Sequence, residues 1–410
     1  MMAHPFRPGL VGWLLLCFLV FNACAGRCEP SNGTRLGGHL KSLNLYLDNP
    51  PAGKGKAGEI SSDSLRLDLS TPATESVTFE FSIESKMLYA DPASGLALPG
   101  DSPNRRLDLE HNWNEGSWLS QQLAVDRLNL HGSHLGVDWS LGRQAIGFGR
   151  ISLFSPLDII APFPPDALDT EVRPGVDALR ASHYFGLAGQ ASAALIVGQR
   201  RELNSYLVFG GGNIAGIDLL TIAGQLRERP MAGGGFATQL GGMGIKGEVA
   251  CYQGQRVDRS GGDLRKQFAI AGTEIDYRFD NGLILFAQYL YNGAGVDDPE
   301  EYPRAATSAP IREGLSYLLG RHYLMIAPAY ELHPLVTLNG LVIRNLRDGS
   351  FLLRPLLHIS LSDNLALDLF WSFAQGTKPR RAAFWPGIAV PRSEFGTAAD
   401  SGGLFLKYFF

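Results

Sequence analysis

The chain ends on an alternating stretch, Gly403-Leu404-Phe405-Leu406-Lys407-Tyr408-Phe409-Phe410, whose pattern predicts the fold of the whole protein. Successive side chains of a β-strand point to opposite faces, so one face of this stretch carries Leu404, Leu406, Tyr408 and Phe410. In a soluble domain, the terminal aromatic ring would be left in water. In a bilayer the same position of the ring is favourable, because aromatic side chains collect at the membrane–water interfaces. The stretch therefore predicts a strand that lies in a membrane.

This tail resembles the C-terminal strand of Gram-negative outer-membrane β-barrels, which ends on Phe or Trp after apolar residues at every second position. The resemblance implies that Leu404, Leu406, Tyr408 and Phe410 form the signature for membrane insertion. It also implies a multi-pass barrel in the cell outer membrane, with outer-membrane lipid and the barrel-assembly machinery as its partners.

The start of the chain has the pattern of a secretory signal peptide. Arg7 supplies a positive charge, an apolar run extends from Leu10 to Phe21, and small residues follow at Ala23 and Ala25. The apolar run is much shorter than the ~20 residues that a membrane-spanning helix needs. We therefore predict a signal peptide over residues 1–25 and a single barrel domain over residues 26–410.

Alternation recurs along most of the chain. Near residue 80, for example, Val77, Phe79 and Phe81 fall on one face, while Thr78 and Glu80 fall on the other. A repeat of about ten residues per strand is typical of transmembrane barrels, and it predicts about 18 strands. The Gly-rich region between residues 204 and 240 leaves counts of 16 and 20 open. The predicted strands start near residues 37, 63, 76, 120, 135, 176, 190, 204, 216, 232, 245, 267, 282, 315, 335, 351, 365 and 403.

The connections between the predicted strands differ by parity. Links after even-numbered strands are short, as at Asp280-Asn281 and His333-Pro334. Links after odd-numbered strands include the long polar segments 91–117, 147–175, 253–266, 294–314 and 377–400. Bacterial barrels have short periplasmic turns and long extracellular loops. The sequence therefore predicts an all-β, antiparallel transmembrane barrel with both ends of the mature chain on the periplasmic side.

Composition and motifs argue against several other functions. The formal net charge is −4 and no block of basic residues occurs, so we predict no nucleic-acid partner. Beyond the signal peptide, Cys28 and Cys251 remain, and no Cys-x-x-Cys-His motif is present, so no cofactor, covalent haem or metal site is expected. His131-Gly132-Ser133-His134 is interpreted as a turn between strands, and no catalytic constellation can be assembled. We therefore predict that the protein is not an enzyme.

The link 147–175 is the most unusual segment. It contains five prolines and apolar side chains such as Phe154, Ile159 and Phe163, which would be unfavourable in open water. We expect it to fold into the lumen as a constriction or to cap the rim, with its acids Asp158, Asp166, Asp169 and Glu171 opposite the wall arginines Arg143, Arg150 and Arg180. The candidate pore-lining or constriction residues are Arg143, Arg150, Asp158, Asp166, Asp169, Glu171, Arg173, Arg180, Glu274, Asp276, Arg278 and Arg354.

The run from Gly142 to Arg180 resembles a segment shared by porin-like outer-membrane proteins. Some of these proteins are similar to alginate-export barrels, and others are the barrel components of porin–cytochrome conduits. The resemblance implies a channel for small hydrophilic solutes or ions. One alternative is a sheath around a multihaem c-type cytochrome, with periplasmic and extracellular cytochromes as partners in electron transfer. A structural or adhesion barrel is the other. The solute, its selectivity and the oligomeric state stay open.

Overall fold

The computed structural model describes residues 33–48, 57–90, 102–114, 118–257, 259–381 and 389–410. The predicted signal peptide and Cys28 lie outside these residues. No helix among the described residues is long and apolar enough to cross a membrane.

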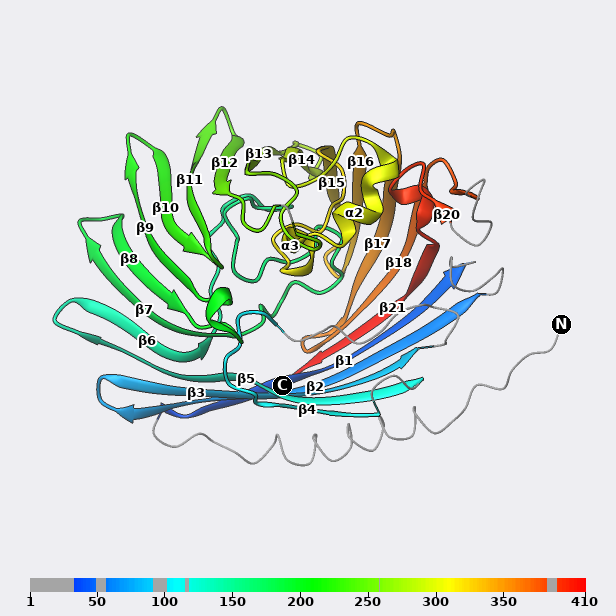
Figure 1. Ribbon diagram of the computed structural model, residues 1–410. Coiled ribbons are helices and arrows are strands. Elements are labelled where there is room, and N and C mark those ends of the chain that lie inside the picture. The colour runs from blue at the N-terminus through cyan, green and yellow to red at the C-terminus, as the bar shows by residue number, and fades with distance from the viewer. Residues whose placement is uncertain (1–32, 49–56, 91–101, 115–117, 258, 382–388) are drawn as a thin grey trace.

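Eighteen antiparallel strands form a closed barrel, which confirms the predicted fold class and strand number (Figure 1). The wall strands are β1 (Arg35–Asp48), β2 (Gly58–Thr74), β3 (Val77–Ala90), β5 (Leu119–His134), β6 (Val137–Gln144), β7 (Val176–Phe185), β8 (Gly189–Ile196), β9 (Ser205–Ile214), β10 (Ile217–Leu226), β11 (Arg229–Leu240), β12 (Met243–Gln253), β13 (Gln267–Arg278), β14 (Ile284–Asn292), β15 (His322–His333), β16 (Val336–Asn345), β17 (Phe351–Ser362), β18 (Leu365–Gln375) and β21 (Asp400–Phe409). Smaller elements lie in the long links: β4 (Glu110–Trp113), α2 (Tyr302–Ala306), α3 (Ala309–Arg312), β19 (Arg380–Arg381), β20 (Ala389–Val390) and the short 3₁₀ turns η4 (Arg201–Leu203), η5 (Pro299–Glu301) and η6 (Phe395–Thr397).

The last strand closes the barrel against the first, as the predicted antiparallel barrel requires. Strand β21 pairs with β18 on one side and with β1 on the other, where Leu43 lies opposite Phe405. The backbone N–H of Gly38 donates to the carbonyl of Phe410 at 3.0 Å, and that of Phe410 donates back to Gly38 at 3.1 Å. Because β21 pairs with both β18 and β1, the ring of eighteen described wall strands closes without an open edge.

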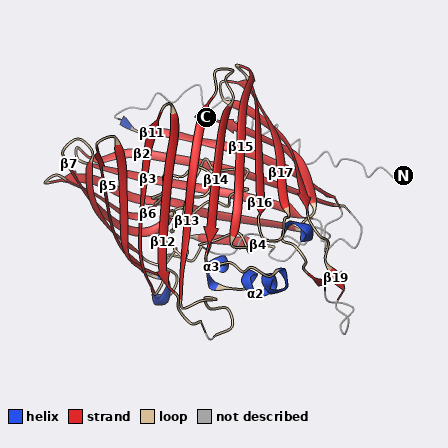
Figure 2. Ribbon diagram, turned by 90° about the horizontal axis from the view of Figure 1, so that it is seen from above, coloured by secondary structure: helices blue, strands red, loops and turns tan. Residues whose placement is uncertain are grey.

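The parity of the connections is also confirmed. Two-residue turns follow β5 and β9, at Leu135-Gly136 and Ala215-Gly216, and all four residues have positive φ. Type I′ turns require positive φ at both central positions and match the twist of the flanking strands. Because the strands are antiparallel, turns after even-numbered wall strands lie at one end of the barrel and links after odd-numbered strands lie at the other. Figure 2 shows α2 and α3, which follow β14, the thirteenth strand of the wall, beyond one end of the strands.

Three local predictions were wrong. Residues His131–His134 belong to β5 and do not form a turn, because the pairing with β6 continues to His134 and Val137. The strand predicted near residue 315 begins at His322, since the preceding residues form α2, α3 and a loop that buries Leu315 and Leu318. The predicted loop 91–117 contains β4, which pairs with Gln121–Ala124 of β5 beyond the end of the short strand β6.

The two faces of the wall differ in what they contact. On β21, Leu404 and Leu406 point outward and are 42% and 37% exposed, whereas Phe405 points inward and is 4% exposed. The main apolar core lies within the barrel, where inward side chains of the wall contact the long links. Its members include Phe154, Leu157, Ile222, Leu318 and Tyr323. The chain itself therefore fills a large part of the lumen.

Candidate functional site

Residues 147–175 form the candidate site, and we call them the inner segment. They connect the neighbouring strands β6 and β7, yet their path leaves this part of the wall and lies inside the ring of strands (Figure 1). One side of the inner segment contacts β12, β13 and β14, and the other contacts β1, β17 and β21. The inner segment therefore reaches two separate regions of the barrel wall, which β15 and β16 divide.

On β12 to β14, polar side chains bind the backbone of residues 150–154. The carboxylate of Glu248 accepts the N–H groups of Arg150 at 2.5 Å and Ile151 at 3.0 Å. Glu274 accepts those of Ser152 at 2.9 Å and Leu153 at 3.1 Å. Buried carboxylates are costly unless hydrogen bonds compensate for the lost water, and here backbone amides supply those bonds.

Gln288 completes this row because it lies opposite Glu274 in the pairing of β13 with β14. Its side-chain amide accepts the N–H of Phe154 at 3.0 Å and donates to the carbonyl of the same residue at 2.6 Å. An amide can satisfy both backbone groups of one residue, whereas a carboxylate can only accept. The row therefore fixes the backbone of residues 150–154, and Glu248 also accepts the hydroxyl of Ser155 at 2.5 Å.

Glycines of the wall form a socket for the inner segment. The side chain of Leu157 is fully buried against β11, where a Cβ at Gly233 or Gly235 would lie 2.7 or 3.2 Å from its methyl groups. On β13, a Cβ at Gly272 would lie 3.2 Å from Ile151. The Gly-rich strands, which alternate weakly in sequence, thus lack inward side chains at the places where the inner segment packs.

Substitution of Gly235 by Val is expected to displace both Glu248, whose Cγ would lie 2.8 Å from the added Cβ, and Leu157, and so to loosen the inner segment. Overpacking of this kind costs about 1–3 kcal/mol, and single-channel recording should show a higher conductance. Gly234→Val is the matched control, because Gly234 is the next residue on β11 and a Cβ there meets no atom closer than 3.4 Å. Equal conductance of the two variants would contradict this role for the socket.

The opposite side of the inner segment is held by charge. Lys41 of β1 contacts Asp169 at 2.7 Å and Glu171 at 2.8 Å. Lys407 of β21 contacts the other oxygen of Glu171 at 3.0 Å and also Asp368 of β18 at 3.0 Å. Glu171 therefore bridges two lysines on adjacent strands, and two carboxylates of the inner segment share one ammonium group.

A third cation, Arg354 of β17, extends this charged row. Its guanidinium donates to the backbone carbonyl of Asp166 at 2.6 Å, while the carboxylate of Asp166 lies 3.9 Å away. Asp368 also contacts His358 of β17 at 2.6 Å. We call Lys41, Lys407 and Arg354, with Asp166, Asp169 and Glu171, the charge ladder.

Three of the four predicted acids, Asp166, Asp169 and Glu171, are thus in contact with the wall, but the predicted arginine partners were wrong. Arg143 is fully buried and binds Asp177 at 2.8 Å together with two backbone carbonyls. Arg150 lies 3.9 Å from Asp218, and Arg180 lies over the ring of Phe209. Arg143 and Arg180 lie on β6 and β7, and Arg150 lies near the start of the inner segment, whereas Asp166, Asp169 and Glu171 contact β1, β17 and β21.

The remaining candidates are divided. Asp158 pairs with Arg173 at 2.6 Å, and both residues belong to the inner segment. Glu274 and Arg354 are wall residues that contact the inner segment at Ser152 and Asp166. Asp276 lies 3.3 Å from Lys246, and Arg278 is exposed at the last position of β13. Sequence reasoning missed Lys41, Gln288 and the socket glycines. An inward position on an alternating strand was the available signal for Lys41 and Gln288.

Two carboxyl groups of the inner segment have shifted pKa values. Burial raises the pKa of Asp158 despite its contact with Arg173. Burial also acts to raise that of Asp169, but the hydrogen bond and positive charge of Lys41 outweigh it and lower the pKa below the ordinary 3.8. A lowered pKa means that the ionised form is the one stabilised by the folded structure.

The contact between Asp169 and Lys41 should therefore persist in mild acid. Its contribution is present above the ordinary pKa of 3.8 and is lost as the pH falls through the lowered value. Infrared titration of the carboxyl band, as the difference between the unaltered protein and the Asp169→Asn variant, should place the midpoint of protonation below pH 3.8. Protonation of Asp169 near pH 5 would contradict the contact.

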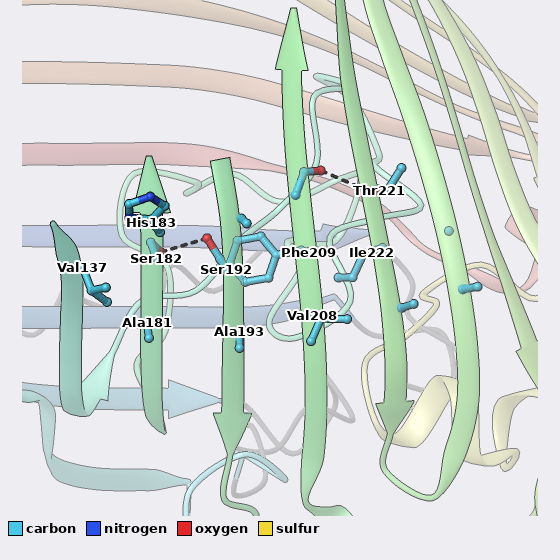
Figure 3. Close-up of a pocket in the computed structure, with 15 residues that line it drawn as sticks. Val137, Ala181, Ser182, His183, Ser192, Ala193, Val208, Phe209, Thr221 and Ile222 are labelled. Atoms are coloured by element: carbon cyan, nitrogen blue, oxygen red, sulfur yellow. Dashed lines mark hydrogen bonds between the residues drawn. The ribbon is translucent and has the colours of Figure 1, made fainter. Parts of the chain in front are cut away.

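Two pockets of the structure have different surroundings, one beside the inner segment and one on strands β6 to β11. One, of about 650 Å³, is bounded by the inner segment at Phe148, Asp158 and Arg173 and by Leu341 of β16. The other, of about 730 Å³, lies across β6 to β11, where Figure 3 shows Ala181, Ala193 and Val208 on neighbouring strands. Val208 is 58% exposed and points outward. The second pocket therefore belongs to the outer face of the barrel and not to its lumen.

The same architecture occurs in solved bacterial structures. OccAB4 of Acinetobacter baumannii has a TM-score of 0.53 at 8% identity, with 93% of this chain and 99% of that chain covered. The fold is that of the bacterial outer-membrane porins. A Salmonella typhi OmpF complex with daunomycin has a TM-score of 0.49 at 11% identity, covering 92% and 98%. A triple mutant of Rhodopseudomonas blastica porin has a TM-score of 0.47 at 12% identity, covering 92% and 100%. No protein-family model and no curated protein matches the sequence.

Proposed function

We propose that this protein is a porin-like channel of a Gram-negative outer membrane, and that the inner segment narrows its lumen for small hydrophilic solutes or ions. The observation that carries the proposal is the path of the inner segment, which contacts Glu248 and Glu274 on one side of the lumen and Lys41 and Lys407 on another. A segment held at both sides restricts the passage that an 18-strand wall would otherwise leave open.

The porin fold and the apolar outer face support the membrane location. Large apolar side chains such as Leu179, Leu353, Leu369 and Leu404 are 38–45% exposed. A surface of this kind is unfavourable in water but suits the hydrocarbon of a bilayer. On this reading, the short turns face the periplasm, the long links face the outside, and the terminal stretch serves as the insertion signature.

The charges inside the barrel have mixed signs and largely neutralise one another. Arg66, for example, contacts Asp126 at 2.6 Å, and Lys246 contacts Glu274 at 2.8 Å. Strong selection between anions and cations needs a ring of charges of one sign. The proposed channel should therefore hold water and select weakly by charge, with the size of the gap beside the inner segment limiting the solute.

Planar bilayers test the proposal directly. Purified protein without partners is expected to produce discrete conductance steps. Absence of steps would contradict the channel. A c-type cytochrome that co-purifies with the non-conducting barrel from outer membranes would instead favour the sheath, and a non-conducting barrel without one would favour the structural or adhesion role. The inner segment occupies space that a cytochrome in the lumen would need, so we rank the channel first.

A further inference from the structure

The inner segment consists of two parts that are held by different forces. Residues 150–157, the fixed limb, include the buried side chains Ile151, Phe154 and Leu157, and their backbone is bound by Glu248, Glu274 and Gln288. Residues 166–172, the lumen limb, include no buried side chain. The wall groups found in contact with the lumen limb are the cations of the charge ladder.

The two parts also differ in their access to water. The carboxylates of Asp166, Asp169 and Glu171 are 49%, 37% and 38% exposed, although the ladder cations Lys41, Lys407 and Arg354 are only 3%, 9% and 10% exposed. The carboxylate of Glu274, which holds the fixed limb, is fully buried. Salt screens exposed charges strongly, because the Debye length falls from about 30 Å at 0.01 M to about 3 Å at 1 M. Hydrogen bonds between buried carboxylates and backbone amides are much less sensitive to the salt concentration.

Both ends of the lumen limb are anchored. Pro165 is buried before it, and Gly175 after it donates to Asp126 at 2.9 Å and accepts from Arg105 at 2.8 Å. The limb can therefore move away from the wall without release of the whole inner segment. When it moves, Lys407 keeps its contact with Asp368 at 3.0 Å, and Lys41 gains water from the widened lumen.

We propose that the lumen limb is a salt-sensitive gate that the charge ladder holds closed against β1, β17 and β21. At low ionic strength the limb stays on the wall and narrows the passage. At high ionic strength the ladder weakens, the limb leaves the wall and the passage widens, while the fixed limb stays in place. This inference rests on the proposed channel function, since it assigns one moving part of that channel.

Spin labels on the full chain in lipid vesicles test the movement without a need for current. One label is placed at Thr170→Cys on the lumen limb and another at Ser152→Cys on the fixed limb, both at exposed positions. Labelled protein without an introduced cysteine supplies the background. Between 0.05 M and 1 M KCl, the mobile fraction at position 170 should rise about threefold, as expected for charges screened over this range, and that at position 152 should stay constant.

Removal of the ladder should have the same effect as salt. In the Lys41→Gln/Lys407→Gln variant, or in Asp169→Asn/Glu171→Gln where the first does not fold, the label at position 170 should already be mobile at 0.05 M KCl. Arg380→Gln is the control, because Arg380 pairs with Glu300 at 2.5 Å on the exposed long-link side, with both side chains more than half exposed. It should leave the salt response unchanged.

Three results would overturn the gate. The label at position 170 could ignore both salt and ladder substitutions, the label at position 152 could become mobile in parallel, or Arg380→Gln could match the ladder variants. Bilayer recordings separate this inference from the channel itself. Current without movement of the limb overturns the gate alone, whereas movement without current overturns the channel and, with it, the gating role.

Discussion

Deletion of residues 154–170 is expected to raise the single-channel conductance severalfold. These residues contain the apolar contacts of the fixed limb, including Phe154 and Leu157, and the ladder residues Asp166 and Asp169. The remaining residues need only connect β6 with β7, which are neighbours in the wall. The barrel can therefore close without them, while the lumen loses the segment that crosses it.

The deletion is measured in planar bilayers beside the unaltered protein. Circular dichroism and the heat-dependent shift in gel mobility should first establish that the shortened barrel is folded. Conductance should then rise and selectivity between potassium and chloride should stay weak, because the wall still carries both signs of charge. A folded deletion variant with unchanged conductance would refute the inner segment as the constriction.

The Arg229→Met substitution is expected to have the largest effect on stability, a loss of about 3–5 kcal/mol. Arg229 binds both oxygens of Asp263, at 2.8 and 2.7 Å, and Glu313 at 2.6 Å. Its side chain is 2% exposed and that of Asp263 is 0% exposed. The variant leaves the buried carboxylate of Asp263 without its cationic partner, and it weakens the connection of β11 to Glu313, which Arg227 still contacts.

Urea unfolding in detergent, followed by tryptophan fluorescence, measures this loss. Arg256→Met is the matched control, because Arg256 pairs with Glu228 at 2.8 Å but the two side chains are 49% and 39% exposed. An exposed pair contributes about 0–1 kcal/mol. The double variant Arg229→Met/Asp263→Asn should recover part of the loss, since it removes the stranded charge. An Arg229→Met variant as stable as the control would refute the argument.

Much of the wall could be predicted from local patterns. Alternation such as that of Val77 to Glu84 assigns the inward face of a strand, and two-residue turns such as Ala215-Gly216 mark its end. These signals depend on residues close together in the chain. The same signals failed where a tertiary contact decided the outcome, as at Leu315 and Leu318, whose burial belongs to a loop and not to a strand.

The site was predicted only in part, for a related reason. Proline and apolar residues marked segment 147–175 as unusual, and its acids were among the candidates. Their partners were not predictable, because Lys41 and Glu171 are 130 positions apart and meet across the lumen. In the sequence, Gly233 and Gly235 indicate a weakly patterned strand. The structure shows why glycine is needed there, because Leu157 packs against both positions.

By itself, the sequence determined the closed barrel, its strand parity and the place of the terminal stretch ending in Phe410 as the strand that pairs with β1. Period-two alternation and turn residues are local patterns, so they can be recognised in the sequence without knowledge of the fold. The tertiary structure alone decided which charges meet and which limb of the inner segment is buried. Those contacts depend on the curvature of the wall and the path of the segment through the lumen, neither of which a local pattern encodes.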